Sequence, residues 1–188
     1  MQTRILTRVA TQPLTHNRAV HITMWVSAFT IATALSAQVR IPLPFTPVPI
    51  TLQTFFVLLA GVVLGSGWGA LSQGVYLAIG TFGLPVFAGG GAGIAHLTGA
   101  TAGYLLACPA AAYLAGLLAG RELKRVRVYP ALLIAGLLIL AAGTTWIALL
   151  FDWSLDRAAL AGFWPFVAGD LVKTVAAAEL GLKIGRRS

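Results

Sequence analysis

Charged side chains are scarce in this chain, and acidic ones are the scarcest. Of the 188 residues, 13 are Lys or Arg and 5 are Asp or Glu, so charged residues make up 10% of the sequence. Soluble domains contain about 25% charged residues, whereas 58% of this chain is hydrophobic. The deficit excludes a surface that lies mainly in water, and it indicates a protein whose solvent is the lipid bilayer.

Motifs for catalysis, metal binding and nucleotide binding are also missing. The single cysteine, Cys108, excludes an intrachain disulfide and a multi-cysteine metal site, and its apolar surroundings predict that it only packs. No Ser/His/Asp set, HExxH motif, carboxylate pair or P-loop occurs, and a lone His96 does not predict a metal site. We therefore expect no enzyme activity and no cofactor. Transport against a gradient would need energy from a partner protein or an ion gradient.

The net charge of +8 comes from basic residues that gather in short clusters between apolar runs. Ten of the 13 Lys and Arg lie in residues 1–21, 121–127 and 183–187. This distribution predicts membrane topology rather than nucleic-acid binding, and the positive-inside rule places all three clusters in the cytoplasm. The other three basic residues are Arg40, Arg157 and Lys173.

Apolar runs predict an all-α integral membrane protein with six transmembrane helices and cytoplasmic termini. The helices are expected at 22–39, 51–64, 68–79, 98–119, 130–151 and 160–184, with a tight turn at 65–69 and a polar loop at 152–157. Residues 1–188 would form one membrane domain, with a tail (1–21), a bundle (22–184) and a C-terminal end (185–188). The second and third helices are short against ~30 Å of hydrocarbon. Small residues at 34–37 allow a signal peptide as the alternative for the first run.

Residues 40–51, "RIPLPFTPVPIT", are apolar yet hold four of the nine prolines. Proline lacks an N–H and favours extended backbone before it, so this segment has few donors to satisfy at membrane depth. It is either a stiff lid that dips into the membrane or an ordinary interfacial loop. Arg40 at its start either anchors the lid at the headgroups or attracts an anionic ligand group.

The motif "GDLVK" places Asp170 and Lys173 three residues apart, on one face of the last helix. Ionisable residues inside a membrane helix normally face a cavity, a partner or a pathway. Lys173 is therefore expected to meet an anionic ligand group, with Asp170 orienting it or accepting a ligand N–H. The alternative is a self-neutralising pair near the outer interface. Glu179 is expected to pair with Lys183 at i+4.

Residues 81–97, "TFGLPVFAGGGAGIAHL", form a glycine-rich connection that suits flexible closure over a pocket. Small residues also recur at a spacing of four, as in Ala28-x-x-x-Ala32 and Gly61-x-x-x-Gly65. Such spacing allows close helix packing, or docking of another membrane protein on a face left over.

Four stretches resemble the BioY family, the biotin-specific substrate-binding components of energy-coupling factor (ECF) transporters. They are "AQVRIPLPFTPVPITLQTF" (37–55), "GLPVFAGG" (83–90), "GATAGYLL" (99–106) and "GDLVK" (169–173). The family often has Gly-Pro-Thr-Gly-Gly where this chain has Gly-Ala-Thr-Ala-Gly at 99–103. The resemblance implies high-affinity biotin capture at the outer side of a bacterial cytoplasmic membrane. It also implies a scaffold subunit and two cytoplasmic ATPases as partners, with Ala28 and Ala32 docking the scaffold.

The resemblance further implies that the outer loops 40–50 and 81–97 close over biotin. The expected ligand-binding residues are Asp170, Lys173, Phe45, Thr46, Val48, Gln53, Phe87, Gly89, Thr101 and Tyr104, with Trp164 as a further apolar candidate. Two alternatives stay open beside this one. The chain could be a self-sufficient transporter acting as a homo-oligomer, or a structural membrane protein whose polar pair only locks the last helix.

Overall fold

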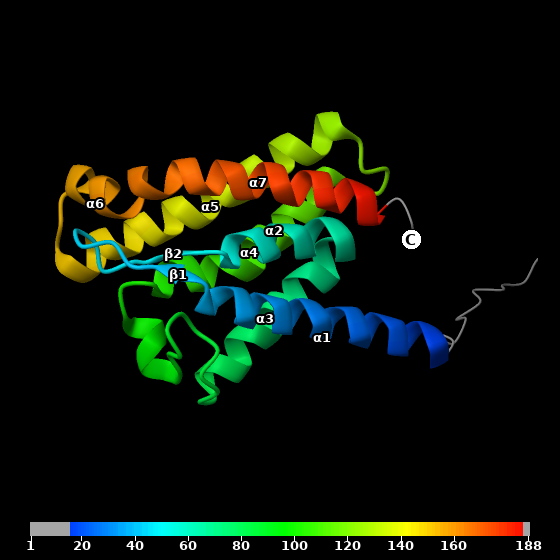
Figure 1. Cartoon of the computed structure of the whole chain (residues 1–188), viewed down its shortest axis with the longest axis horizontal. Coiled ribbons are helices and arrows are strands. Elements are labelled where there is room, and N and C mark those ends of the chain that lie inside the picture. The colour runs from blue at the N-terminus through cyan, green and yellow to red at the C-terminus, as the bar shows by residue number, and fades with distance from the viewer. Residues whose placement is uncertain (1–15, 186–188) are drawn as a thin grey trace, which may run out of the picture.

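The computed structural model describes residues 16–185, which form an almost entirely helical bundle (Figure 1). Within that range it has seven α-helices, one 3-10 helix and one two-stranded hairpin. The elements are α1 (His16–Gln38), β1 (Arg40–Ile41), β2 (Ile50–Thr51), α2 (Gln53–Leu64), α3 (Ser66–Thr81), η1 (Ile94–Thr98), α4 (Ala102–Ala119), α5 (Arg125–Phe151), α6 (Leu155–Gly162) and α7 (Trp164–Gly185). Most of the expected N-terminal tail and the last three residues lie outside the described range.

Helices α1 and α3 begin earlier than expected, whereas α2 begins two residues later, at Gln53. Helix α1 starts at His16 instead of residue 22 and runs unbroken past residues 34–37, where a cleavage site was the alternative. Helix α3 starts at Ser66, so Gly65 alone separates it from α2. Gly65 has φ of +79°, a conformation that glycine adopts without steric cost. The expected five-residue turn is therefore a single-residue corner.

Helix α4 begins later than expected and α5 begins earlier. Residues 94–98 form η1, and Gly99 is extended, so α4 starts at Ala102 rather than at residue 98. Helix α5 starts at Arg125 because the Lys124 carbonyl accepts from the N–H groups of Arg127 and Val128, both at 2.9 Å. Pro130 therefore lies in the second turn and does not open the helix.

The predicted polar loop at 152–157 is shorter than expected, because residues 152–154 are non-helical but a short helix begins at Leu155. The Ser154 side chain caps it by accepting from the Arg157 N–H, which is the ordinary role of serine at a helix start. Helix α6 then ends at Phe163, and α7 continues at an angle of 45°. The predicted single helix at 160–184 is thus two helices joined by a sharp bend.

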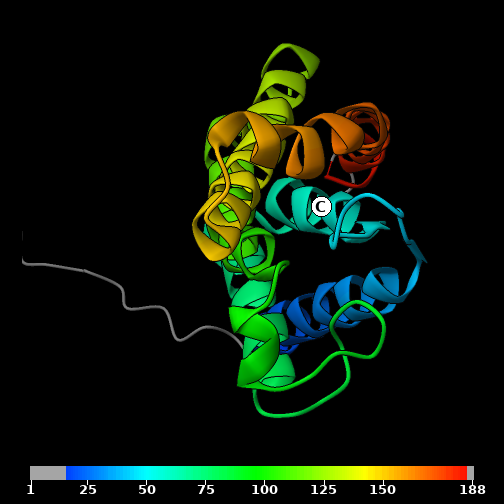
Figure 2. The ribbon, with the colours of Figure 1, turned by 90° about the vertical axis from the view of Figure 1, so that its left-hand side faces the viewer.

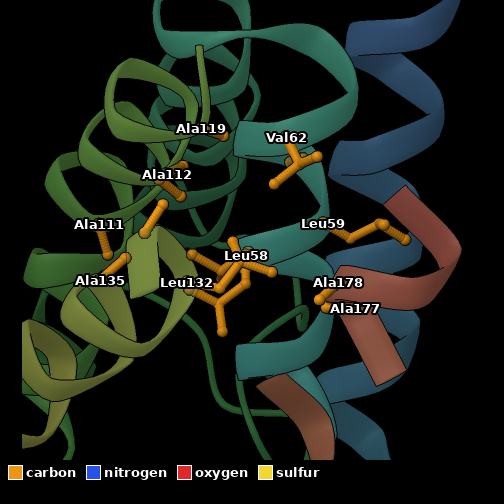
Figure 3. Close-up of a cluster of buried hydrophobic side chains, with 14 of the residues drawn as sticks. Leu58, Leu59, Val62, Ala111, Ala112, Ala119, Leu132, Ala135, Ala177 and Ala178 are labelled. Carbon is orange, nitrogen blue, oxygen red and sulfur yellow. The ribbon is translucent and has the colours of Figure 1, made fainter. Parts of the chain in front are cut away.

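The core lies around α2, which is apolar on all sides and therefore buried. Leucines and valines of α2 point between the alanines of α4 and α7 and the side chains of α5 (Figure 3). The alanine faces let the helix backbones approach closely: a side chain at Gly61 of α2 would collide with the Ala112 carbonyl of α4. This small-residue contact is internal packing, as the spacing predicts.

Three described helices are long and apolar enough to cross a membrane: Arg18–Gln38, Ala102–Ala119 and Arg125–Phe151. The bent pair α6 and α7 together makes a fourth candidate. At 12 residues, α2 spans only about 18 Å. The start of α1, the α4–α5 connection and the end of α7 lie at one end of the molecule, and the hairpin and α6 lie at the other (Figure 1).

The proline-rich segment forms a β-hairpin whose ends pair antiparallel, Arg40 with Thr51 and Ile41 with Ile50. Viewed from this end, the hairpin lies between α1 and α7, and the glycine-rich connection runs beneath α1 (Figure 2). The segment is extended and non-helical, as its prolines predict, and its strands bring Thr51 beside α7.

Candidate functional site

The ion pair of α7 is buried against the hairpin. The Lys173 Nζ lies 2.5 Å from the Asp170 Oδ1, and the two side chains are only 11% and 10% exposed. Lys173 also donates to the main-chain carbonyl of Thr51 at 2.9 Å. A buried pair pays for desolvation of both charges, so it is weak evidence for stability and typical of a functional site. The two charges neutralise each other, which the ligand-binding interpretation and the alternative of a self-neutralising pair both allow.

A cavity opens beside this pair, beneath the hairpin. Its free volume is about 60 Å³, room for a few water molecules. Its wall is built by the hairpin and α2 (Val48, Pro49, Thr51, Gln53 and Thr54) and by the glycine-rich connection (Ala88 and His96). Helix α4 and its N-cap add Thr101, Tyr104, Leu105 and Cys108. Helix α5 adds Ile139 and Leu140, and α7 adds Phe166, Asp170 and Lys173. An apolar pocket with a few convergent polar groups is the usual form of a small-molecule site.

Six of the sequence-predicted residues line this cavity together. They are Val48, Gln53, Thr101, Tyr104, Asp170 and Lys173. They come from four separate segments of the chain, so their meeting in one cavity depends on the fold.

The other predicted ligand residues do not line the cavity. Phe45 at the hairpin tip and Trp164 at the start of α7 are 62% and 63% exposed. Thr46 accepts a hydrogen bond from the Val48 N–H at 3.3 Å, so it shapes the hairpin. Phe87 is fully buried, in edge contact with Tyr76.

Gly89 and Arg40 lie against each other at the rim. Gly89 has φ of +74°, and any side chain there would collide with the Arg40 guanidinium. Arg40 thus joins the hairpin to the glycine-rich connection by packing.

Gln38, which the sequence did not single out, holds the glycine-rich connection in place. Its Nε2 donates to the carbonyls of Phe87 at 3.0 Å and Val86 at 3.3 Å, and its Oε1 accepts from the Gly90 N–H at 3.0 Å. One side chain at the end of α1 therefore binds residues 86–90 through three hydrogen bonds. Backbone acceptors leave no signal in a sequence, so only the fold reveals this contact.

His96 and Cys108 also have a place that the sequence did not predict. The His96 ring stacks on Phe87 at 5.0 Å and lies 3.4 Å from the Thr101 hydroxyl. Burial lowers the pKa of His96, which favours its neutral form. Cys108, expected only to pack, lines the cavity, where its Sγ donates to the Tyr104 carbonyl at 3.2 Å.

Tyr104 connects the cavity wall to the bend between α6 and α7. Its hydroxyl donates to the Gly162 carbonyl at 2.6 Å. The ring lies directly on Gly143 of α5, where a side chain would overlap it. The wall of the cavity therefore depends on a glycine in a neighbouring helix.

Two further predictions concern residues outside the cavity. Ala28 is exposed on α1 in a shallow groove, and Ala32 is half-buried, so the structure leaves this face of α1 partly uncovered. Glu179 does not pair with Lys183 as expected. It accepts instead from Arg125 at 3.0 Å and from the Tyr129 hydroxyl, two side chains of α5.

A model of the BioY family matches residues 7–188. A protein of Pyrococcus horikoshii named "probable biotin transporter BioY" is 41% identical over 152 residues, which are 81% of this chain and 88% of that protein. The "biotin transporter BioY" of Thermotoga maritima is 39% identical over 156 residues, 83% of this chain and 90% of that one.

A solved structure has the same fold. It is the crystal structure of an S-component for biotin from an ECF-type ABC transporter, with a TM-score of 0.86 and 25% sequence identity. The match covers 93% of this chain and 95% of that one. The all-helical bundle described above is therefore an S-component fold.

Proposed function

Because the chain belongs to the BioY family, a family of multi-pass membrane transporters, we propose that it captures biotin and delivers it for uptake as the substrate-binding subunit of an ECF-type transporter. The observation that carries the proposal is the buried Asp170–Lys173 pair at the wall of the cavity. The choice of biotin as the ligand rests on the names of the relatives and of the structurally similar protein.

Biotin has a carboxylate on an apolar valerate chain and a ureido group on a fused ring, and the cavity offers a partner for each part. The Lys173 ammonium would bind the carboxylate, in a charge-assisted hydrogen bond that is about twice as strong as a neutral one. The Asp170 carboxylate would accept hydrogen bonds from the ureido N–H groups, and the Gln53 amide would donate to the ureido oxygen. Val48 and Phe166 are buried and apolar, and they would cover the ring and the chain.

The hairpin and the glycine-rich connection would act as the lid. The cavity has a free volume of about 60 Å³ and lies beneath both segments, so we infer that the lid moves when the ligand enters. The hairpin is stiffened by proline and tied to α7 through Thr51 and Lys173. The glycine-rich connection is tied to α1 through Gln38.

The chain would cross a bacterial cytoplasmic membrane six times, with α6 and α7 as one bent span and both termini in the cytoplasm. The basic clusters at the end that carries the start of α1 and the end of α7 support this orientation. The exposed small-residue face around Ala28 supports docking of a scaffold subunit that carries two ATPases.

Equilibrium binding of radiolabelled biotin to the purified protein tests this function. We expect saturable binding that lipoate does not displace, because lipoate has the same valerate carboxylate but no ureido group. An absence of saturable binding would contradict this function and favour the alternative of a structural membrane protein. Uptake into cells that lack the scaffold and ATPase subunits would instead show a self-sufficient transporter.

A further inference from the structure

A second groove lies at the opposite end of the molecule from the cavity, between α1, the α2–α3 corner and the end of α7. Its volume is about 400 Å³. The groove is lined chiefly by Arg18, His21 and Trp25 of α1, Leu64 of α2, Trp68 of α3 and Ile184 of α7. None of these residues belongs to the cavity proposed to bind biotin.

The lining of the groove combines basic and polar side chains with aromatic and aliphatic ones. Arg18 and His21 lie one turn apart on the face of α1 that also carries Trp25. Trp25 and Trp68 are 44% and 47% exposed, and tryptophan prefers the headgroup level of a membrane. Apolar side chains of α2 and α7 line the rest of the groove.

The charge around the groove is positive. None of the chain's five carboxylate side chains lines it. Two of these carboxylates, those of Glu122 and Glu179, form ion pairs with Lys124 and Arg125, respectively. An adjoining hollow, which shares Trp68 with the groove, adds Arg121.

The other side of α1 has a different character. The groove that contains Ala28 is lined by small and aliphatic side chains and by no charged residue. Such a surface suits the helix of a protein partner. The basic groove suits an anionic headgroup, because basic pockets between membrane helices at the cytoplasmic side bind lipids of this kind.

We propose that this groove binds one anionic phospholipid. The phosphate lies against Arg18 and His21, and an acyl chain follows Leu64 and Ile184 between the two tryptophans. The inference concerns a surface separate from the cavity, so it stands or falls independently of biotin binding.

Native mass spectrometry of the purified protein tests the site, with phosphatidylglycerol and phosphatidylcholine titrated separately. We expect one tightly retained lipid that is phosphatidylglycerol in preference to phosphatidylcholine. Arg18→Gln should weaken retention of phosphatidylglycerol about fivefold, the effect of one basic residue near an anionic lipid. Arg127→Gln removes an exposed charge at the same end without touching the groove, and it should change nothing.

Equal retention of the two lipids would overturn the proposal, as would equal losses in the two variants. If Arg18→Gln retains phosphatidylglycerol but no longer copurifies with the scaffold subunit, the groove is a protein-docking surface and the lipid site is wrong. Size-exclusion chromatography and circular dichroism of the same samples show whether both variants are folded.

Discussion

The Lys173 ammonium donates to the main-chain carbonyl of Thr51 at 2.9 Å, which joins the middle of α7 to the last residue of the hairpin. The same ammonium is held by Asp170. A carboxylate ligand that binds Lys173 would compete with the Thr51 carbonyl and with Asp170 for the same ammonium group. We therefore expect ligand binding and the position of the hairpin to be coupled through this one side chain.

Gln38→Leu should loosen the glycine-rich connection. The substitution removes three hydrogen bonds to residues 86–90, each worth about 0.5–1.5 kcal/mol. We expect faster amide hydrogen exchange at residues 87–91 and a biotin dissociation rate raised about tenfold. Stopped-flow release of bound biotin measures the rate.

Leu35→Ala serves as the control for this prediction, because Leu35 lies on the exposed face of the same helix. It should leave both the exchange and the release rate unchanged. An unaltered rate of biotin release from Gln38→Leu would mean that the hydrogen bonds of Gln38 do not hold the lid.

Gly143→Ala should damage the cavity wall. The new methyl group would overlap the Tyr104 ring and displace its hydroxyl from the Gly162 carbonyl. Overpacking of this kind costs about 1–3 kcal/mol, so we expect a lower melting temperature and weaker biotin binding.

Gly74→Ala is the matched control, since Gly74 is also helical but has open space around it. A methyl group there should be neutral or slightly stabilising. Melting curves in detergent compare the two variants, and equal melting temperatures would refute the close contact at Gly143.

Stability should fall at mildly acidic pH because of His96. Its pKa is lowered in the folded protein, whereas the unfolded chain has the usual value of about 6.5. Between these two values the unfolded state binds more protons, so stability is full above pH ~6.5 and is lost as the pH falls toward the folded pKa. His96→Phe keeps the stack on Phe87 but cannot titrate.

Melting temperatures measured between pH 5.5 and 7.5 test this expectation. The wild type should lose more stability than His96→Phe over that range. The difference between the two proteins removes the contributions of His16 and His21, which both retain. Parallel curves would show that the pKa of His96 is the same in the folded and the unfolded protein, which would contradict the lowering by burial.

Much of the helical frame follows from the sequence, because long apolar runs have few alternatives. Asp170 and Lys173 were predictable as neighbours, since their spacing puts them on one face of any helix. The break at Phe163 was overlooked, although Gly162 and Pro165 mark it: proline breaks a helix in its interior, whereas the first turn of the next helix tolerates it.

The partners of the site residues were harder to predict than the residues. Lys173 binds the Thr51 carbonyl and Gln38 binds the Phe87 carbonyl. Main-chain acceptors exist at every residue, so the sequence carries no mark of which one is used. Phe45 illustrates the opposite case: its apolar character suggested ligand contact, but the hairpin directs it outward.

The central claim is that Lys173 binds the carboxylate of biotin, and titration of Lys173→Met with biotin tests it most directly. Tryptophan fluorescence follows the titration, and size-exclusion chromatography confirms that the variant is folded. Lys183→Met, an exposed lysine in the last turn of the same helix, is the control. Loss of one partner of a buried charge pair costs about 2–5 kcal/mol, so the Kd should rise at least about thirtyfold in Lys173→Met alone. A folded Lys173→Met protein with wild-type affinity would contradict the account.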